Sequence, residues 1–481
     1  MKKYIFAALL LAGMVAFMAP PQAFAEDEKP FTIHGEVRSR AEYDNNVDDL
    51  HDSQNPTATE PGFDDGALFF PYRVRIAAEG HFTKNVSAWI EFQNTGSWGD
   101  DFSGPRRAGD FSSDTKMYQG NITLSHLWSK SFSLKLGRQE IVAGNELMLG
   151  DEDFYGGISH DGAVGTWDLK NFDVMAWWTR SFQDNSLGFS GTGDLTPDQI
   201  DWAGNAADVN NREFWGGYLT WTFKKNQIVD VYLMNLDDRG VGARVDTIGA
   251  RYAHDDRTKN SFYWNAEVAQ QFGNASTASV LGPPATEDVN ASGMVVEGWF
   301  GFNMKQAKNV HRFYGRFEMA SGDDAGTSDK NEGYMEMFGD RHNRLGHGDW
   351  FRLNGNPSGI ASGNLGICTA TEGCGSGIQA FSVGYNGFYN DRHELGVAFW
   401  NYTLDRAADV DPTAAVQNED ALGTAWDLWY GFNFSKNVSF EASYSELSAG
   451  KALKDNAGAG PFSPTGSDSV QRLYGQIRLR F

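Results

Sequence analysis

The sequence has 481 residues, and its 63 acidic and 40 basic side chains give a formal net charge of −23, which argues against nucleic acid or an anionic surface as a general partner. After the N-terminal segment no run of 18 or more apolar residues occurs, so no membrane-spanning helix is expected. Aromatic residues reach 14%, with 55 glycines and 2 cysteines, a composition shared by transmembrane β-barrels and secreted all-β proteins.

The first 25 residues are typical of a secretory signal peptide. Lysines at positions 2 and 3 precede an apolar core at residues 5–18, and Ala-Phe-Ala at 23–25 is a small-x-small cleavage site. A membrane anchor is the alternative, but the apolar stretch is short and Pro20 and Pro21 end it. We therefore expect cleavage after Ala25 and one folded domain over residues 26–481.

Residues 31–43 alternate between an apolar and a charged face. The odd positions are Phe31, Ile33, Gly35, Val37, Ser39, Ala41 and Tyr43. The even positions are Thr32, His34, Glu36, Arg38, Arg40 and Glu42. Because successive side chains of a strand point to opposite faces, this segment predicts a β-strand, whereas a helix would mix the two sets.

The same alternation recurs in about 18 segments of roughly 10 residues, the length that crosses the hydrocarbon layer at a barrel tilt. The segments begin near Phe31, Phe69, Val86, Met117, Phe132, Ala163, Phe172, Phe214, Ile228, Val245, Phe262, Met294, Val310, Ile378, Arg392, Thr424, Val438 and Val470. The pattern predicts a closed antiparallel transmembrane β-barrel of about 18 strands, with the count uncertain by about two.

Short and long connections between these segments alternate. Short turns lie at 83–85, 129–131, 170–171, 224–227, 305–308 and 435–437, and long polar loops at 45–67, 97–115, 143–161, 182–212, 273–292, 321–376, 403–423 and 448–469. Such sorting is expected when each hairpin has one periplasmic and one external end. The connection 237–243 is an exception, since it is short for an external loop.

Aromatic residues lie at the segment ends, where amphipathic rings favour the lipid headgroups. The predicted girdle residues are Tyr43, Phe69, Phe70, Trp98, Trp128, Trp177, Trp178, Trp215, Trp221, Phe399, Trp400 and Trp426. The last strand ends on Phe481, which resembles the C-terminal signal that outer-membrane barrels carry for the barrel-assembly machinery.

A barrel of this size is too wide for side chains alone to fill, so water or folded-in loops must occupy it. The odd or even position of a residue within its alternating segment, called here its parity, predicts which face it lies on. By this rule the inward basic residues are Arg38, Arg40, Arg73, Arg75, Lys135, Arg251, Arg312, Arg316, Arg472, Arg478 and Arg480. The inward acidic residues are Glu36, Glu42, Glu79, Glu91, Glu267, Glu318 and Glu441. We expect most of them to pair across strands. The sharper hypothesis is that an arginine ladder on the first two strands, closing against Arg478 and Arg480 on the last, guides anions.

The external loops carry many carboxylates, which we interpret as solvated groups. They are Asp48, Asp49, Asp52, Asp64 and Asp65 in one loop and Glu146, Asp151, Glu152 and Asp153 in another. The alternative is that they bind divalent cations and so bridge to lipopolysaccharide phosphates. The loop 321–376 is long enough to fold inward as a constriction. Cys368 and Cys374, in a Gly-rich segment of the same loop, predict a local disulfide, because two ligands are too few for a metal site.

The segment 136–140, with Gly137-Arg138-Gln139, followed by Ala143-Gly144 and Leu149-Gly150, resembles the Gly-Arg-Gln…Gly signature of the alginate-export family of outer-membrane barrels. Similar stretches follow in order at 246–249, 266–273, 320–324, 337–340 with His342 and Gly346, 423–428 and 444–445. The resemblance implies an 18-stranded channel lined by basic residues that pass an acidic polysaccharide, with Arg138 among the lining residues. Parity directs Arg138 toward lipid, so we expect a bulge at Gly137 to redirect it. The mixture of carboxylates with arginines in the predicted lumen departs from the family pattern.

An outer-membrane enzyme is the rival class. The consecutive residues Ser159, His160 and Asp161 cannot easily converge on one point as a triad. Asp340, His342, His347 and Asp349 could supply metal ligands within one loop, but a polar loop held by hydrogen bonds is the favoured interpretation. We therefore predict no enzyme activity, no metal and no cofactor.

The predicted function is an outer-membrane porin for small hydrophilic solutes or oligosaccharides, anionic or polar, surrounded by lipid and lipopolysaccharide. Two alternatives stay open: an exporter of an acidic exopolysaccharide such as alginate, and a structural or adhesive surface barrel that serves as a sleeve for a partner protein. Ion conduction in a planar bilayer separates the channel hypotheses from the structural one.

Overall fold

The computed structural model describes residues 31–45, 67–98, 115–154, 156–181, 212–238, 243–276, 288–323, 330–353, 377–406, 420–455 and 469–481. The signal segment 1–25, most of the acidic loop 45–67 and both cysteines, Cys368 and Cys374, lie outside these residues. Signal cleavage and the disulfide therefore stay predictions.

The described residues contain 21 strands, of which β2 (Ala67–Phe69), β13 (Asp288–Ala291) and β16 (Lys330–Asn331) are short extensions. The other eighteen are β1 (Phe31–Asn45), β3 (Pro71–Thr83), β4 (Val86–Ser97), β5 (Thr115–Ser125), β6 (Phe132–Gln139), β7 (His160–Leu169), β8 (Phe172–Ser181), β9 (Arg212–Lys224), β10 (Gln227–Asp238), β11 (Ala243–His254), β12 (Ser261–Ser276), β14 (Met294–Gln306), β15 (Asn309–Ala320), β17 (Ile378–Tyr389), β18 (His393–Leu404), β19 (Ala421–Asn433), β20 (Val438–Ala449) and β21 (Ser469–Arg480). Each begins within three residues of its predicted start, so the predicted strands are confirmed.

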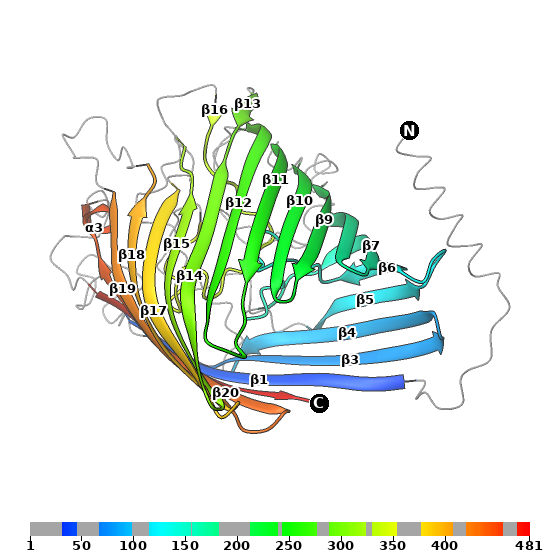
Figure 1. The fold of residues 1–481 in the computed structure, drawn as a ribbon, viewed down its shortest axis with the longest axis horizontal. Coiled ribbons are helices and arrows are strands. Elements are labelled where there is room, and N and C mark those ends of the chain that lie inside the picture. Colours follow the sequence, from blue (N-terminus) through cyan, green and yellow to red (C-terminus); the bar gives the residue numbers. More distant parts are fainter. Residues whose placement is uncertain are drawn as a thin grey trace, which may run out of the picture.

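These eighteen strands form one closed antiparallel barrel (Figure 1). Each pairs with its neighbours in chain order, and β1 closes the ring by pairing with both β3 and β21. Closure satisfies every sheet edge, as a sheet in hydrocarbon requires. Within the described part of the chain no helix is long and apolar enough to cross a membrane.

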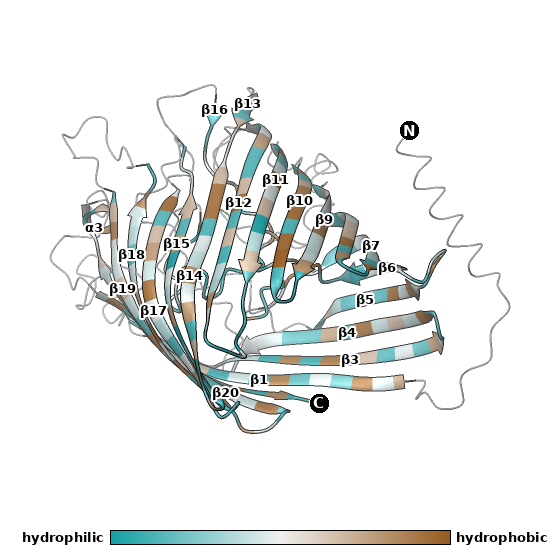
Figure 2. Ribbon diagram, in the orientation of Figure 1, coloured by the Kyte–Doolittle hydropathy of each residue, from teal (hydrophilic) through white to brown (hydrophobic). Residues whose placement is uncertain are grey.

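Alternate residues of each strand face opposite sides of the wall. Along β1 the even positions from Glu36 to Asp44 are buried, whereas Ile33 and Val37 on the other face are exposed. Bands of hydrophilic and hydrophobic colour alternate along β1 and β3 (Figure 2). Since the exposed positions are apolar and the inward ones charged, the outer face suits lipid and the inner face a polar lumen.

β10 and β11 are joined at the end of the long loops by residues 239–242, which is the short exception noted in the sequence. The other short connections lie at the opposite end of the barrel, at residues 84–85, 126–131, 170–171, 225–226, 255–260, 307–308, 390–392 and 434–437. The chain begins β1 and ends β21 at this same end, where the amide N–H groups of Gly35 and Phe481 each donate to the other's carbonyl, at 2.9 and 3.0 Å. The ring of Phe481 covers the outer face of Gly35, where a Cβ would lie 2.3 Å from its Cζ.

Two external loops fold into the lumen. The first inward loop comprises residues 140–159, and the second comprises residues 332–353. They pair with each other where Gly150 N–H donates to Phe338 O at 2.7 Å and Asp340 N–H donates to Glu146 O at 2.9 Å. The hypothesis that loop 321–376 folds inward is therefore confirmed for its described part.

These loops pack on an apolar zone of the inner wall that the predicted charged lumen did not include. Phe214 of β9, Met234 of β10 and Val295 of β14 face inward and are at most 1% exposed. They form one cluster with apolar residues of both inward loops. Two predicted girdle residues, Trp177 and Trp400, also point into this zone, so their assignment to the membrane interface was wrong.

Candidate functional site

Closure of the barrel brings together arginines from its first, second and last long strands. Arg38 of β1 lies opposite Arg73 of β3 on one side and opposite Arg478 of β21 on the other. The group, called here the arginine cluster, comprises Arg38, Arg40, Arg73, Arg75, Arg478 and Arg480. All six lie on the inner face, as parity predicted.

Asp153 of the first inward loop enters the arginine cluster. Its Oδ1 accepts hydrogen bonds from Arg73 at 2.7 Å and Arg75 at 3.1 Å, and its Oδ2 lies 3.2 Å from Arg478 Nη2. Its main-chain carbonyl accepts from Arg38 at 2.7 Å and from Arg73 at 2.6 Å. Burial alone would raise the pKa of Asp153, but Arg73, Arg75 and Arg478 outweigh it and hold this pKa well below its usual range. The interpretation of this carboxylate as a solvated external group was therefore wrong.

The next residue fixes the loop against the same wall. Arg40 donates to the carbonyl of Phe154 at 2.7 Å and stacks its guanidinium 3.5 Å from the centre of that ring. A guanidinium over an aromatic face gains cation–π attraction as well as packing. The first inward loop is thus anchored by contacts that hold both its main chain and its side chains.

Carboxylates form ion pairs with members of the arginine cluster. Besides Asp153, Glu36 lies 2.6 Å from Arg73, Glu42 lies 3.3 Å from Arg40, and Glu140 lies 3.9 Å from Arg75. Among the described residues, four carboxylates therefore form ion pairs with this cluster, and Glu42 is shared with Arg472 of β21. A concentration of guanidinium groups borders the lumen although the whole chain is strongly acidic.

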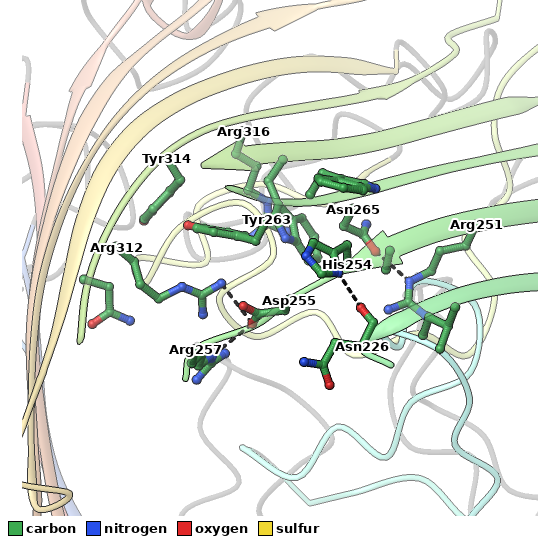
Figure 3. Close-up of a pocket in the computed structure, with 15 residues that line it drawn as sticks. Asn226, Arg251, His254, Asp255, Arg257, Tyr263, Asn265, Arg312, Tyr314 and Arg316 are labelled. Carbon is green, nitrogen blue, oxygen red and sulfur yellow. Dashed lines mark hydrogen bonds and ion pairs between the residues drawn. The ribbon is translucent and has the colours of Figure 1, made fainter. Parts of the chain in front are cut away.

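A cavity of about 490 Å³ lies across the ring from this cluster, at the short-turn end of the lumen. Its walls come from β10, β11, β12, β14, β15 and β17, with contributions from the 225–226 and 255–260 turns. Figure 3 shows Arg312 and Arg257 converging on Asp255, with Tyr263 and Tyr314 beside them. The polar and aromatic lining suits a hydrophilic solute with a ring or a sugar face.

The four arginines of this cavity differ in how they are paired. Arg251 forms an ion pair with Asp230, and Arg316 lies between Glu297 and Glu318. Arg257 and Arg312 share the single carboxylate of Asp255, at 2.9 and 3.2 Å. The guanidinium of Arg312 also stacks over Tyr263, 4.0 Å from the ring centre. This pair therefore has one carboxylate for two guanidinium groups, whereas Arg316 has two carboxylates beside it.

The other predicted inward carboxylates also lie on the inner face and have partners. Glu79 lies 3.5 Å from His34, Glu91 accepts from Gln119 at 2.8 Å, and Glu267 accepts from Tyr232 at 2.7 Å. Glu318 accepts from Arg316 at 2.6 Å, and Glu441 accepts from Tyr474 at 2.6 Å. Most predicted lumen charges are thus engaged within the wall or with a neighbouring strand.

Arg138 is the exception among the predicted lining residues. The pairing of β6 with β5 and β7 is continuous from Ser133 to Arg138, so the expected bulge at Gly137 does not occur. Arg138 therefore points outward, as simple parity implies. It forms a bidentate ion pair with Asp161, with hydrogen bonds of 2.7 and 2.8 Å. The register shift in this region lies instead on β5, between Met117, which pairs with Phe92, and Gln119, which pairs with Glu91.

Sequence reasoning missed the groups that hold the second inward loop. Arg344 of this loop forms a buried ion pair with Glu297 of β14, and Asp427 of β19 accepts the N–H of His347 at 3.0 Å. Glu297 and Asp427 lie at inward positions of alternating strands, so parity could have marked them. Their loop partners follow no periodicity. The sequence marked His347 as part of a polar loop but did not link it to Asp427, and it did not indicate Arg344.

Comparison with known proteins agrees with this architecture. A family model described as alginate export matches residues 32–354. Among curated proteins no sequence matches this one.

Three similar solved structures are outer-membrane proteins of Pseudomonas aeruginosa. OccK2 (OpdF) superposes with a TM-score of 0.55 at 12% identity, covering 95% of this chain and 98% of its own. OprD gives 0.54 at 12%, covering 96% and 97%. OpdK, solved with vanillate, gives 0.53 at 12%, covering 95% and 100%. At these identities the likeness establishes the 18-stranded barrel fold.

Proposed function

This chain belongs to the alginate export family, a family of transport barrels rather than of enzymes, and from that premise we propose that it is an outer-membrane channel for small hydrophilic solutes or oligosaccharides, anionic or polar. We further propose that the signal segment is removed after Ala25 and that the assembly machinery recognises Phe481. Lipid and lipopolysaccharide then surround the outer face.

One observation carries the proposal: guanidinium groups gather on both sides of the lumen. The arginine cluster borders one side, and the pair Arg257 and Arg312, sharing Asp255, borders the other. Fixed charges along a pore raise the local concentration of counter-ions and so select among solutes. Carboxylate, phosphate or sulfate groups are the chemistry that guanidinium groups bind best.

Export of an acidic exopolysaccharide such as alginate is the second candidate, and the family membership favours it. The two inward loops argue for shorter solutes. They pack on each other and on the wall through a buried cluster that includes Leu149, Phe338 and Trp350. A continuous polymer would need these loops to leave the lumen, whereas a small solute would need only the space around them.

The test compares two single substitutions of basic residues in one turn. Arg257 lines the cavity with a half-exposed side chain, so Arg257→Gln leaves the wall intact. Lys259 in the same turn is more exposed and does not line the cavity, so Lys259→Gln is the matched control. In planar bilayers, removal of one charge near the path lowers the anion-to-cation permeability ratio roughly two-fold for Arg257→Gln and leaves it unchanged for Lys259→Gln.

Equal selectivity of both variants and the wild type would remove this cavity from the solute path. A barrel that inserts but does not conduct would instead favour the structural or sleeve function.

A further inference from the structure

Two histidines of the second inward loop meet a glutamate of the barrel wall. His342 and His347 and Glu441 of β20 each present a ligand atom, and these three atoms all lie within 4.8 Å of one another. We propose that they form a binding site for a divalent transition-metal ion, with Zn²⁺ as the best fit. The sequence suggested both histidines together with Asp340 and Asp349 as possible ligands, and it placed Glu441 on the inward face without linking it to them.

The orientation of His342 is fixed by a carboxylate. Its Nδ1 lies 2.8 Å from Asp349 Oδ2, and the other oxygen of Asp349 accepts the N–H of Asn343 at 3.0 Å. An N–H donated from Nδ1 to a carboxylate fixes the tautomer in which Nε2 carries the lone pair. Metal-binding histidines commonly have such a carboxylate partner, which also makes the ligand nitrogen more basic.

His347 is held by stacking and by its main chain. Its ring lies parallel to that of Trp429, with 4.5 Å between centroids, and its N–H donates to Asp427 at 3.0 Å. Its Nδ1 is buried and has no hydrogen-bond partner among the residues that the structure describes. A buried ring nitrogen without a partner is costly, and a bound metal ion would satisfy it.

Glu441 is oriented from the wall side. Tyr474 donates to one of its oxygens at 2.6 Å, and Gln476 donates to the other at 2.9 Å. Each carboxylate oxygen has a second lone pair, so these bonds orient the ligand without saturating it. Tetrahedral Zn²⁺ with bonds of about 2.1 Å needs ligand atoms roughly 3.4 Å apart, so a closing movement of about 1 Å completes the site.

The charge and the donor set both favour a transition metal. Two arginines of the wall lie beside the site, and both have carboxylate partners. Arg40 pairs with Glu42 at 3.3 Å. Arg472 donates to Gly348 O in this loop and pairs with Asp44 at 2.9 Å. Two imidazoles and one carboxylate are a common Zn²⁺ set that leaves a fourth position for water. Ca²⁺ and Mg²⁺ prefer all-oxygen sites.

Because two ligands come from the loop and one from β20, the ion would fasten the second inward loop to the wall. The loop does not depend on the ion for its fold, since Tyr402 donates to Leu345 O at 2.7 Å and Arg344 pairs with Glu297. The chain stripped of metal therefore stays folded, and metal binding is measurable on it.

The test is calorimetric titration of Zn²⁺, and separately of Ca²⁺, into the full chain in detergent after EDTA treatment. We expect one Zn²⁺ per chain and no Ca²⁺ binding over the same range. His347→Gln and Glu441→Gln are each expected to weaken Zn²⁺ binding by at least roughly 100-fold, whereas Asp349→Asn, which only orients His342, weakens it roughly 10- to 100-fold. The control is His126→Gln, a histidine exposed in the 126–131 turn.

Far-UV circular dichroism of each variant shows whether the barrel is retained, and Asp349→Asn keeps the test decisive if a ligand variant fails to fold. Absence of Zn²⁺ binding to the wild type, equal binding of Ca²⁺, or affinity unchanged by the ligand variants would overturn the site. None of these outcomes depends on whether the barrel conducts solutes.

Discussion

Asp153→Asn is the substitution that separates the two roles of the arginine cluster. The variant keeps the size of the side chain and the main-chain carbonyl contacts to Arg38 and Arg73. It removes the negative charge that lies between Arg73, Arg75 and Arg478. The first inward loop should therefore loosen while the lumen becomes more positive.

Two magnitudes follow from the geometry. Charge-assisted hydrogen bonds contribute about 1.5–3 kcal/mol each, so the loss of charge at a carboxylate shared by three arginines costs about 2 kcal/mol after its remaining contacts are counted. That loss corresponds to roughly 30-fold faster local opening. For a monovalent ion about 8 Å away in water, one added charge changes the energy by about 0.5 kcal/mol, with opposite sign for anions and cations. Screening by salt reduces the resulting change in permeability ratio to roughly two- to five-fold.

Both effects can be measured on one preparation. Hydrogen exchange should quicken at the amide of Ile158, which bonds to Asp151 O at 2.8 Å and closes the turn around Asp153. The reversal potential in a bilayer should shift toward the value for an ideally anion-selective channel. Asp391→Asn, in an exposed short turn, is the matched control for which neither value changes. If Asp153→Asn left both the exchange rate and the reversal potential at their wild-type values, the proposed role of Asp153 would be refuted.

Two further predictions concern the inward loops. Phe338→Ala removes a 3% exposed ring that contacts His160 and Phe214. The free energy of unfolding should fall by about 3–5 kcal/mol, and single-channel conductance should rise as the second inward loop leaves the wall. Unchanged conductance and an unchanged melting temperature would argue against this packing. Burial, Asp151 and Asp340 raise the pKa of Glu146 to about 7 in the folded protein, so the folded state binds more protons than the unfolded state between about pH 4.5 and 7, and stability falls as the pH rises through this window. Glu146→Gln should abolish that loss of stability. The melting temperature of the variant minus that of the wild type should therefore rise from pH 5 to 7 and stay constant above pH 7. A difference that does not change with pH would contradict the raised pKa of Glu146.

Period-two alternation explains why so much of the wall was predictable. Because alternate residues of a strand face opposite sides, the positions of Arg73 and Glu267 within their strands place them toward the lumen, and closure then places the last strand beside the first. The same alternation placed Arg138 outward. The family resemblance, which implied a lining role, was the reason for expecting a bulge that the structure does not contain.

The contents of the lumen could not be predicted in the same way. The path of a loop such as 140–159 depends on tertiary contacts, and no local pattern links Asp153 to Arg73 and Arg75, which lie 80 and 78 residues away in sequence. For Trp177 and Trp400 the prediction was wrong because it placed them at the membrane interface. They lie near strand ends, where a girdle is expected, yet they face inward because folded-in loops supply an apolar partner there.

The central claim is that the arginines lining the lumen govern transport although the chain as a whole is acidic. Its most direct test is the reversal potential of the wild-type protein in a planar bilayer across a KCl gradient. Our account predicts a conducting barrel with a reversal potential of the sign set by chloride. A cation-selective potential, or a barrel that inserts without conducting, would contradict it.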